Sequence, residues 1–298
     1  MKTDDQIRSD VREHYGAIAR SAQACCEPTA KTPQAGCCAP TATGFERGEA
    51  SRVLGYSAAD MRAVPETANL GLGCGNPQAI AELRAGEVVV DLGAGGGFDA
   101  FLAARAVGQT GRVIGVDMSA DMVALARTNA AKHAAANVEF RLGEIEHMPV
   151  PDATADVIMS NCVINLAPDK RAVYAEALRV LKPGGRLAIS DVVALAPMPQ
   201  HLADDVAARC GCIAGAALAS ELPQLLAEVG FTDVRVDIDP ASADVIASWA
   251  PGEGLERLVA SARIRASKPG GPANKSAGPA GADTGTKAGA CCEPGCCS

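Results

Sequence analysis

The sequence predicts an α/β fold built on one open, mostly parallel sheet with helices on both faces. From residue 77 onward, short apolar runs alternate regularly with helical patterns. The run Val88-Val89-Val90 is continuously apolar, as expected of a strand covered on both faces. Lys182-Pro183-Gly184-Gly185 is a strong helix stop placed directly before another apolar run. The 298 residues allow one large domain or two modest ones.

The helices and strands are predicted from the spacing of apolar residues and from the residues that typically begin or end such elements. Apolar residues at Ile7, Val11, Tyr15 and Ile18 predict an amphipathic N-terminal helix over residues 4–20. Residues 24–44 are rich in Cys, Pro, Thr and Gly, which is typical of an irregular loop. Strands are expected at 87–91, 113–116, 138–142, 155–160, 186–191 and 234–238. Helices are expected at 77–83, 97–107, 119–136 (capped by Ser119), 171–181, 202–209, 220–229 and 254–266.

Charge and hydropathy exclude several classes of protein. The net charge of -8 argues against a nucleic-acid binder. No run of about 18 apolar residues predicts a membrane span, and the stretch Met1–Asp5 lacks a hydrophobic signal segment. We therefore expect a cytoplasmic protein, and we also expect it to be a monomer. Thiols are kept reduced in the cytoplasm, so the 12 cysteines indicate metal-binding or catalytic roles rather than disulfides.

A glycine-rich loop follows the first strand of the sheet. It reads Asp91-Leu92-Gly93-Ala94-Gly95-Gly96-Gly97, and Asp117 ends the next strand, where a carboxylate can accept ribose hydroxyls. A dinucleotide needs Gly-x-Gly-x-x-Gly/Ala; counted from Gly93 this pattern fails at Phe98, and counted from Gly95 it reaches Ala100 only weakly. S-adenosylmethionine has no phosphate and suits an acidic strand end with Gly-x-Gly-x-Gly. The loop therefore favours S-adenosylmethionine.

Further motifs resemble the class I methyltransferases. Asp156-Val157-Ile158-Met159-Ser160-Asn161 is similar to that family's fourth strand, and the stretch from Ala177 to Leu187 is similar to its helix, turn and fifth strand. The resemblance covers roughly residues 77–239 and implies a Rossmann-like sheet that binds S-adenosylmethionine. It implies these cofactor-binding residues: Asp91, Gly93, Gly95, Gly97, Asp117, Met118, Glu144, Ile145, Glu146 and Asn161.

Three cysteines lie far apart in the sequence, each in a Gly- or Asn-marked loop. A lone cysteine is more often a small buried residue than a ligand. However, Cys162 follows the fourth strand, at the sheet edge where ligands bind in open α/β folds. Cys74 directly precedes the sheet, and Cys212 lies after the fifth strand, where a substrate cap is expected. We expect these three thiols to converge.

The loops around these cysteines resemble the arsenite methyltransferase family. The similar segments are Gly73-Cys74-Gly75-Asn76-Pro77, Asn161-Cys162-Val163-Ile164-Asn165-Leu166 and Cys212-Ile213-Ala214-Gly215-Ala216. The resemblance extends over about residues 10–267. It implies that Cys74, Cys162 and Cys212 are the catalytic ligands of trivalent arsenic. It also implies redox exchange by an N-terminal cysteine, either Cys25 or Cys26, while Cys210 is an extra thiol that could compete with Cys212.

Soft trivalent arsenic prefers thiolates, and three sulfurs leave it a lone pair that can attack an activated methyl group. The step needs no general base, and the four histidines show no grouping of a catalytic triad. Arsenite, or an arsenic-thiol conjugate, is the expected substrate. Each transfer oxidises arsenic, so turnover requires a thiol reductant such as thioredoxin or glutathione.

The predicted organisation has four parts. Residues 1–60 hold the N-terminal helix and Cys-rich loop, 61–194 the S-adenosylmethionine-binding core, and 195–266 a C-terminal substrate- or arsenic-binding region. Residues 267–298 form a flexible, disordered linker with a CCEPGCC tail. The remaining paired cysteines, at 37–38, 291–292 and 296–297, could capture arsenite or be spare thiols.

Two other functions are compatible with parts of this pattern. A methyltransferase acting on carbon, oxygen or nitrogen of a small metabolite would use the same sheet, but it has no need of three convergent thiols. A binding protein that sequesters soft metals would use the cysteine pairs, but the intact Asp91, glycine loop and Asp117 argue against it.

Overall fold

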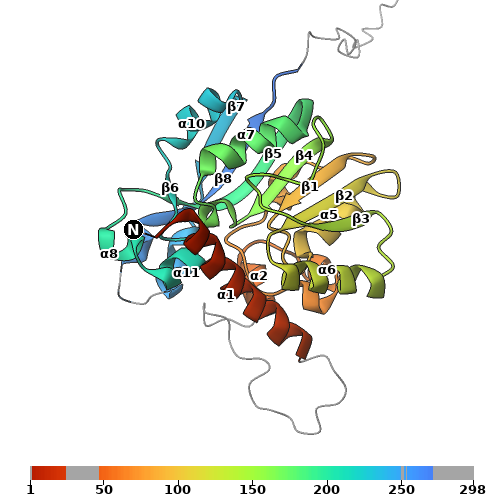
Figure 1. Cartoon of the computed structure of the whole chain (residues 1–298), viewed down its shortest axis with the longest axis horizontal. Coiled ribbons are helices and arrows are strands. Elements are labelled where there is room, and N and C mark those ends of the chain that lie inside the picture. The colour runs from red at the N-terminus through yellow and green to blue at the C-terminus, as the bar shows by residue number, and fades with distance from the viewer. Residues whose placement is uncertain (1, 25–46, 250–251, 253, 271–298) are drawn as a thin grey trace, which may run out of the picture.

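The computed structural model describes residues 2–24, 47–249, 252 and 254–270 (Figure 1). A central sheet has the strand order β3-β2-β1-β4-β5-β8-β7, and β6 pairs with β5 beside this path. The strands are β1 Val88–Leu92, β2 Arg112–Asp117, β3 Val138–Leu142, β4 Ala155–Asn161, β5 Leu181–Ala194, β6 Ala217–Leu218, β7 Thr232–Ile238 and β8 Val259–Ser267. The strands from β3 to β5 are parallel, as predicted, and β8 is antiparallel to both of its neighbours.

Helices cover both faces of this sheet. Alternate residues of each strand point to opposite faces, so Val90 and Ile158 share one core and Val89 and Val157 share the other. The first core packs against α7 (Lys170–Val180) and α10 (Leu222–Val229). The second packs against α4 (Gln78–Ala81), α5 (Phe98–Val107) and α6 (Ala120–Lys132). As predicted, the Ser119 side chain caps α6 by accepting from Met122 N.

The C-terminal end of the sheet differs from the prediction. The helix expected over 254–266 is wrong: η3 (Leu255–Arg257) is a single 3₁₀ turn, and β8 follows it. Along β8, buried Ala262, Ile264 and Ala266 alternate with more exposed arginines, which is a strand period. Alanine and arginine favour helices in isolation, but pairing with β5 and β7 on both sides overrides that preference.

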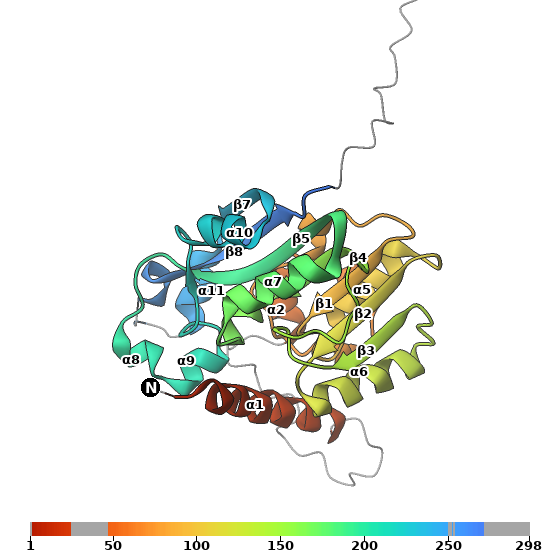
Figure 2. The same cartoon turned by 45° about the horizontal axis from the view of Figure 1, so that its top comes forward.

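The remaining helices lie around the carboxyl ends of the strands. They are α1 Asp4–Ala24, α2 Arg47–Val53, α3 Ala58–Arg62, η1 Glu66–Ala68, η2 Ile164–Leu166, α8 Gln200–Ala203, α9 Val206–Cys210 and α11 Ser242–Trp249. The long helix α1 lies alongside α9 and α6 (Figure 2). Within the described ranges, no helix is long and apolar enough to span a membrane. The predicted N-terminal Cys-rich loop beyond Ala24 and the predicted flexible tail from residue 271 fall outside the described residues. The first residues of that predicted tail are ordered instead, since Ser267 ends β8 and Lys268 N donates to Gly185 O at 2.8 Å.

Candidate active site

A cavity of about 1190 Å³ opens at the carboxyl edge of the parallel strands. Its wall includes the glycine loop, Asp117 at the end of β2 and Cys162 just after β4. The second half of the wall comes from α1, from Cys212 after α9, and from Trp249 at the end of α11. A single cavity therefore joins the predicted cofactor residues to two of the predicted thiols, Cys162 and Cys212, at the edge where open α/β sheets bind ligands. Cys74 is not among its lining residues, although the neighbouring Gly73 is.

Asp91 is the buried carboxylate of the cofactor half. Asp91 follows the apolar residues at the start of β1 and is 2% exposed. Its Oδ2 has no hydrogen-bond partner among the described residues. Burial raises the pKa of Asp91 well above its ordinary value, and the nearby carboxylates of Asp99 and Asp117 raise it further. A buried, unpaired carboxylate of this kind is costly unless a cationic or donor group pairs with it.

The glycine loop shapes the space next to Asp91. Gly93, Gly95 and Gly97 all have positive φ, of 64°, 51° and 97°, which side chains rarely adopt. A Cβ added to Gly95 would meet nothing within 4 Å, so the cavity is open there. Gly97 forms the N-cap of α5.

The other predicted cofactor residues divide into two groups. Asp117 accepts hydrogen bonds from Gly95 N at 2.9 Å and Ser119 N at 2.8 Å, and a carboxylate retains further lone pairs for a ligand. Met118, Ile145, Glu146 and Asn161 also line the cavity. Glu144 is not among the lining residues, and it forms ion pairs with Arg8 and Arg12 instead.

These residues fit S-adenosylmethionine better than a dinucleotide. The buried carboxyl groups of Asp91 and Asp99 and the half-buried Asp117 surround the loop, and their negative charge would repel a pyrophosphate. The ammonium group of a methionine moiety would supply the partner that Asp91 Oδ2 lacks. The site is therefore suited to a cationic ligand without phosphates.

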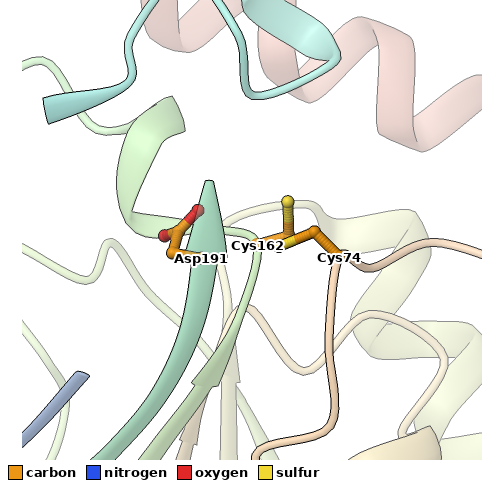
Figure 3. A group of neighbouring side chains, drawn as sticks. All are labelled: Cys74, Cys162 and Asp191. Carbon is orange, nitrogen blue, oxygen red and sulfur yellow. The ribbon is translucent and has the colours of Figure 1, made fainter. Parts of the chain in front are cut away.

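The thiol half brings three distant cysteines together. The sulfurs of Cys74 and Cys162 and a carboxylate oxygen of Asp191 all lie within 4.8 Å of one another (Figure 3). Cys212 Sγ donates to the carbonyl oxygen of Cys162 at 2.8 Å. Cys74 and Cys212 are both 2% exposed. The sulfurs of Cys74 and Cys162 are therefore close, whereas Cys212 contacts the backbone of Cys162 and is not in the group of ligand atoms that lie within 4.8 Å of one another.

Backbone strain accompanies two of these thiols. Cys162 and Cys212 have φ of 57° and 62°, in the left-handed region that favours glycine. Cys162 keeps its place because its N–H donates to Ser190 O of β5 at 2.8 Å. Strain of this kind persists only where the surrounding structure enforces it, and it concentrates at functional sites.

The three thiols are protonated at neutral pH. Burial raises the pKa of Cys74 to about 11. The pKa of Cys212 is well above its ordinary value because of its hydrogen bond with Cys162 and its burial, and that of Cys162 is also raised well above its ordinary value. The site is therefore a set of neutral thiols in the absence of a ligand.

Several residues near the thiols were not predicted from the sequence. Buried Asp191 lies beside Cys74 and Cys162, and burial raises its pKa to about 7. Its position at the carboxyl edge of the fifth strand was the available signal. Tyr15 of α1 donates through its hydroxyl to Cys210 O at 2.8 Å. Cys210 is buried and lines the same cavity, whereas Cys25 and Cys26 lie outside the described residues.

The fold, the glycine loop and the unpaired Asp91 define an S-adenosylmethionine-dependent methyltransferase of class I, and residues 83–230 match the family described as "Methyltransferase domain". An arsenite methyltransferase from Halobacterium salinarum is 47% identical over 269 residues, covering 89% of this chain and 67% of the relative. The mouse arsenite methyltransferase is 30% identical, covering 81% of this chain and 61% of its own length. The chain thus spans between about three fifths and two thirds of these curated relatives.

A solved structure gives the same relationship. The crystal structure of an arsenic(III) S-adenosylmethionine methyltransferase from Chlamydomonas reinhardtii is 31% identical, with a TM-score of 0.54, over 78% of this chain and 75% of that one. A phosphoethanolamine N-methyltransferase from Haemonchus contortus has a TM-score of 0.57 at 19% identity, which shows the shared fold alone. The chain belongs to the arsenite methyltransferase family.

Proposed function

We propose that this chain transfers methyl groups from S-adenosylmethionine to trivalent arsenic held by Cys74, Cys162 and Cys212. The observation that carries the proposal is that Cys162 and Cys212 line the same cavity as Asp91, and that the sulfur of the buried Cys74 lies within 4.8 Å of the Cys162 sulfur. Family membership supports the reaction. The assignment of the individual ligands follows the family resemblance, and the proximity of the Cys74 and Cys162 sulfurs supports it.

Arsenic uptake does not require preformed thiolates. Arsenous acid is neutral, and each As–O bond that exchanges for an As–S bond releases its oxygen as water together with the thiol proton. Three thiols therefore release three waters, and no net proton is lost. The raised pKa of Cys74 is compatible with this exchange.

Methyl transfer then depends on positioning. S-adenosylmethionine supplies a methyl group on a positively charged sulfur, and Asp91 and Asp117 would hold the amino acid and ribose parts. The arsenic lone pair opposite the three sulfurs forms the As–C bond, while the electron pair of the broken C–S bond stays on the donor sulfur. No side chain need remove a proton, so alignment within the cavity carries the rate enhancement.

Turnover requires reduction, because transfer leaves arsenic formally pentavalent. Two site sulfurs can leave as a disulfide, which returns arsenic to the trivalent state, and thioredoxin or glutathione would then reduce that disulfide. We assign the exchange to Cys25 or Cys26, and we place the enzyme in the cytoplasm as a monomer. Replacing Cys25 and Cys26 together by serine should preserve the first methylation and slow later ones.

The test of the ligand assignment is methyl transfer from labelled S-adenosylmethionine, with and without arsenite. C74S, C162S and C212S should each lose at least about 100-fold in rate, because one missing sulfur displaces the arsenic. Binding of S-adenosylhomocysteine should persist in each variant, which shows that the cofactor half is intact. Arsenite-dependent transfer at the wild-type rate in any of the three variants would remove that cysteine from the ligand set.

A further inference from the structure

We propose that the two asparagines flanking Cys162 are positioning residues, and that each fixes the loop of one of the other two cysteines. Asn161 precedes Cys162 by one residue and holds the Cys74 loop. Asn165 follows Cys162 by three residues and holds the Cys212 loop. The inference rests on the proposed three-thiol site, since it explains how that site is assembled.

Asn161 forms hydrogen bonds with two neighbouring backbone groups of the Cys74 loop. Its Oδ1 accepts from Cys74 N at 3.2 Å, and its Nδ2 donates to Gly75 O at 3.0 Å. A side-chain amide thus pairs with this backbone as a neighbouring strand would. A Cβ added to Gly73 would lie only 3.0 Å from Asn161 Nδ2, so the loop packs directly on the amide.

Asn161 is itself held by buried groups. Its Nδ2 also lies 3.0 Å from Asp99 Oδ2 and 3.0 Å from the hydroxyl oxygen of Tyr56. The Tyr56 hydroxyl donates to Asp99 Oδ1 at 2.7 Å. These hydrogen bonds fix the orientation of the Asn161 side-chain amide. They therefore also fix the position of the Cys74 loop that is bonded to it.

Asn165 plays the corresponding part for Cys212. Its Nδ2 lies 2.9 Å from Asp191 Oδ1, 2.6 Å from Val192 O and 3.3 Å from Cys212 O. Asn165 is 3% exposed, and its two amide hydrogens are shared among these three acceptors, of which Cys212 O is the most distant. A Cβ added to Gly215 would lie 2.1 Å from Asn165 O, so the loop after Cys212 also approaches this residue closely.

The two asparagines share no hydrogen-bond partner. Asn161 engages the 74–75 backbone and the Asp99 pair, whereas Asn165 engages β5 and Cys212. Loss of one amide should therefore release one cysteine and leave the other in place. A residue that served only general stability would affect both thiols together, so the identity of the released cysteine is diagnostic.

The experiment is arsenite protection of individual thiols. In the full-length chain, the eight cysteines at 25–26, 37–38, 291–292 and 296–297 are replaced by serine, so that only Cys74, Cys162, Cys210 and Cys212 remain. Each variant is alkylated with N-ethylmaleimide with and without arsenite, and the modified cysteines are identified by mass spectrometry. X-ray absorption counts the sulfurs bound to arsenic.

In the parent, arsenite should slow alkylation of Cys74, Cys162 and Cys212 at least tenfold, with three sulfurs on arsenic. In N161A, Cys74 alone should lose this protection; in N165A, Cys212 alone should lose it, and the sulfur count should fall to two. N137A is the matched control: Asn137 donates to Ala104 O and Gly108 O, at the opposite edge of the sheet. It should behave as the parent.

The proposal is overturned if both variants release the same cysteine, or if both keep all three protected. If an alanine variant shows no cooperative unfolding, the corresponding Asn→Ser variant takes its place with the same expected release. Absence of protection in the parent is a different result: it contradicts the proposed arsenic site itself.

Discussion

The buried carboxyl group of Asp91 is suited to a cationic ligand and affects the stability of the ligand-free protein. Its carboxylate is buried and Oδ2 is unpaired. The folded-state pKa lies above the ordinary value of 3.8, so the folded protein binds this proton more tightly than the unfolded chain does. The carboxyl group therefore lowers the stability of the free protein increasingly as the pH rises above about 4.

D91N should separate stability from ligand binding. At pH 7 to 8 the ligand-free variant should be more stable than the wild type in urea, and the difference should vanish toward pH 4. Affinity for S-adenosylmethionine should fall about 30-fold, which corresponds to about 2 kcal/mol for one lost charge-assisted hydrogen bond. The measurements are urea unfolding across the pH range and calorimetry.

The exposed Asp244, in the first turn of α11, provides the control. D244N should leave affinity for S-adenosylmethionine unchanged and should not gain stability at pH 7 to 8, because a carboxylate at a helix N-terminus is favourable. A D91N variant whose stability parallels that of the wild type at every pH would contradict the account of Asp91.

The sequence predicted the thiols and Asp91 more fully than the residues that hold them. Cys74, Cys162 and Cys212 were found because each lies in a marked loop. Asn161 was predicted as a cofactor contact, and it lines the cavity, but its hydrogen bonds also reach the Cys74 loop. Asn165 was not predicted, because its contacts depend on β5 lying beside β4, and local periodicity does not give strand order.

Among the structural elements, the loop before α4 is packed unusually closely on the sheet. A Cβ added to Gly75 would lie 2.8 Å from Ser190 Cβ and 2.9 Å from its Oγ. Ser190 belongs to β5, which also receives the Cys162 N–H through the Ser190 carbonyl. The distance between Cys74 and Cys162 therefore depends on the absence of a side chain at residue 75.

G75A should push the Cys74 loop away from β5. We expect about 1–3 kcal/mol of destabilisation from overpacking and about a tenfold loss of arsenite affinity, converted at about 1.4 kcal/mol per tenfold. The readouts are urea unfolding and arsenite binding.

G48A is the matched control for G75A, because Gly48 lies within α2 with nothing within 4 Å of the added Cβ. It should gain about 0.5–1 kcal/mol in stability. The double variant G75A/S190G should recover binding; if it does not, the contact with Ser190 is not the cause.

β8 is the strand that the sequence analysis predicted wrongly, as a helix. Residues 259–267 contain three alanines and two arginines, which favour a helix locally. Their register with β5 runs without interruption from Arg186↔Ser267 to Ala194↔Val259. This long-range pairing decides the conformation, whereas the strands of the central βαβ units were predicted because their apolar runs carry the signal locally.

At the scale of the whole molecule, α1 joins the two halves of the site. Arg8 pairs with Glu146 at 3.0 Å on the cofactor side, and Tyr15 binds Cys210 O on the thiol side. The Arg8 and Glu146 side chains are 18% and 5% exposed, so this pair is largely shielded from water. The pair formed by Arg12 and Glu144 is more open, at 46% and 32%.

R8A should destabilise the protein by about 2 kcal/mol, because it leaves the buried Glu146 without its partner. R12A should cost less than about 1 kcal/mol, as exposed ion pairs do. Both variants are compared by urea unfolding at matched ionic strength. Equal losses for the two arginines would mean that burial of the Arg8–Glu146 pair does not matter.

The order in which the strands are made differs from the order in which they lie. β8 is synthesised after β7, yet it is inserted between β7 and β5. A nascent chain that has emerged only as far as residue 258 would carry β5 with one side of its backbone unsatisfied next to apolar residues. Such an open edge invites pairing with other chains. Newly made protein would therefore be most prone to aggregate on the ribosome shortly before β8 emerges.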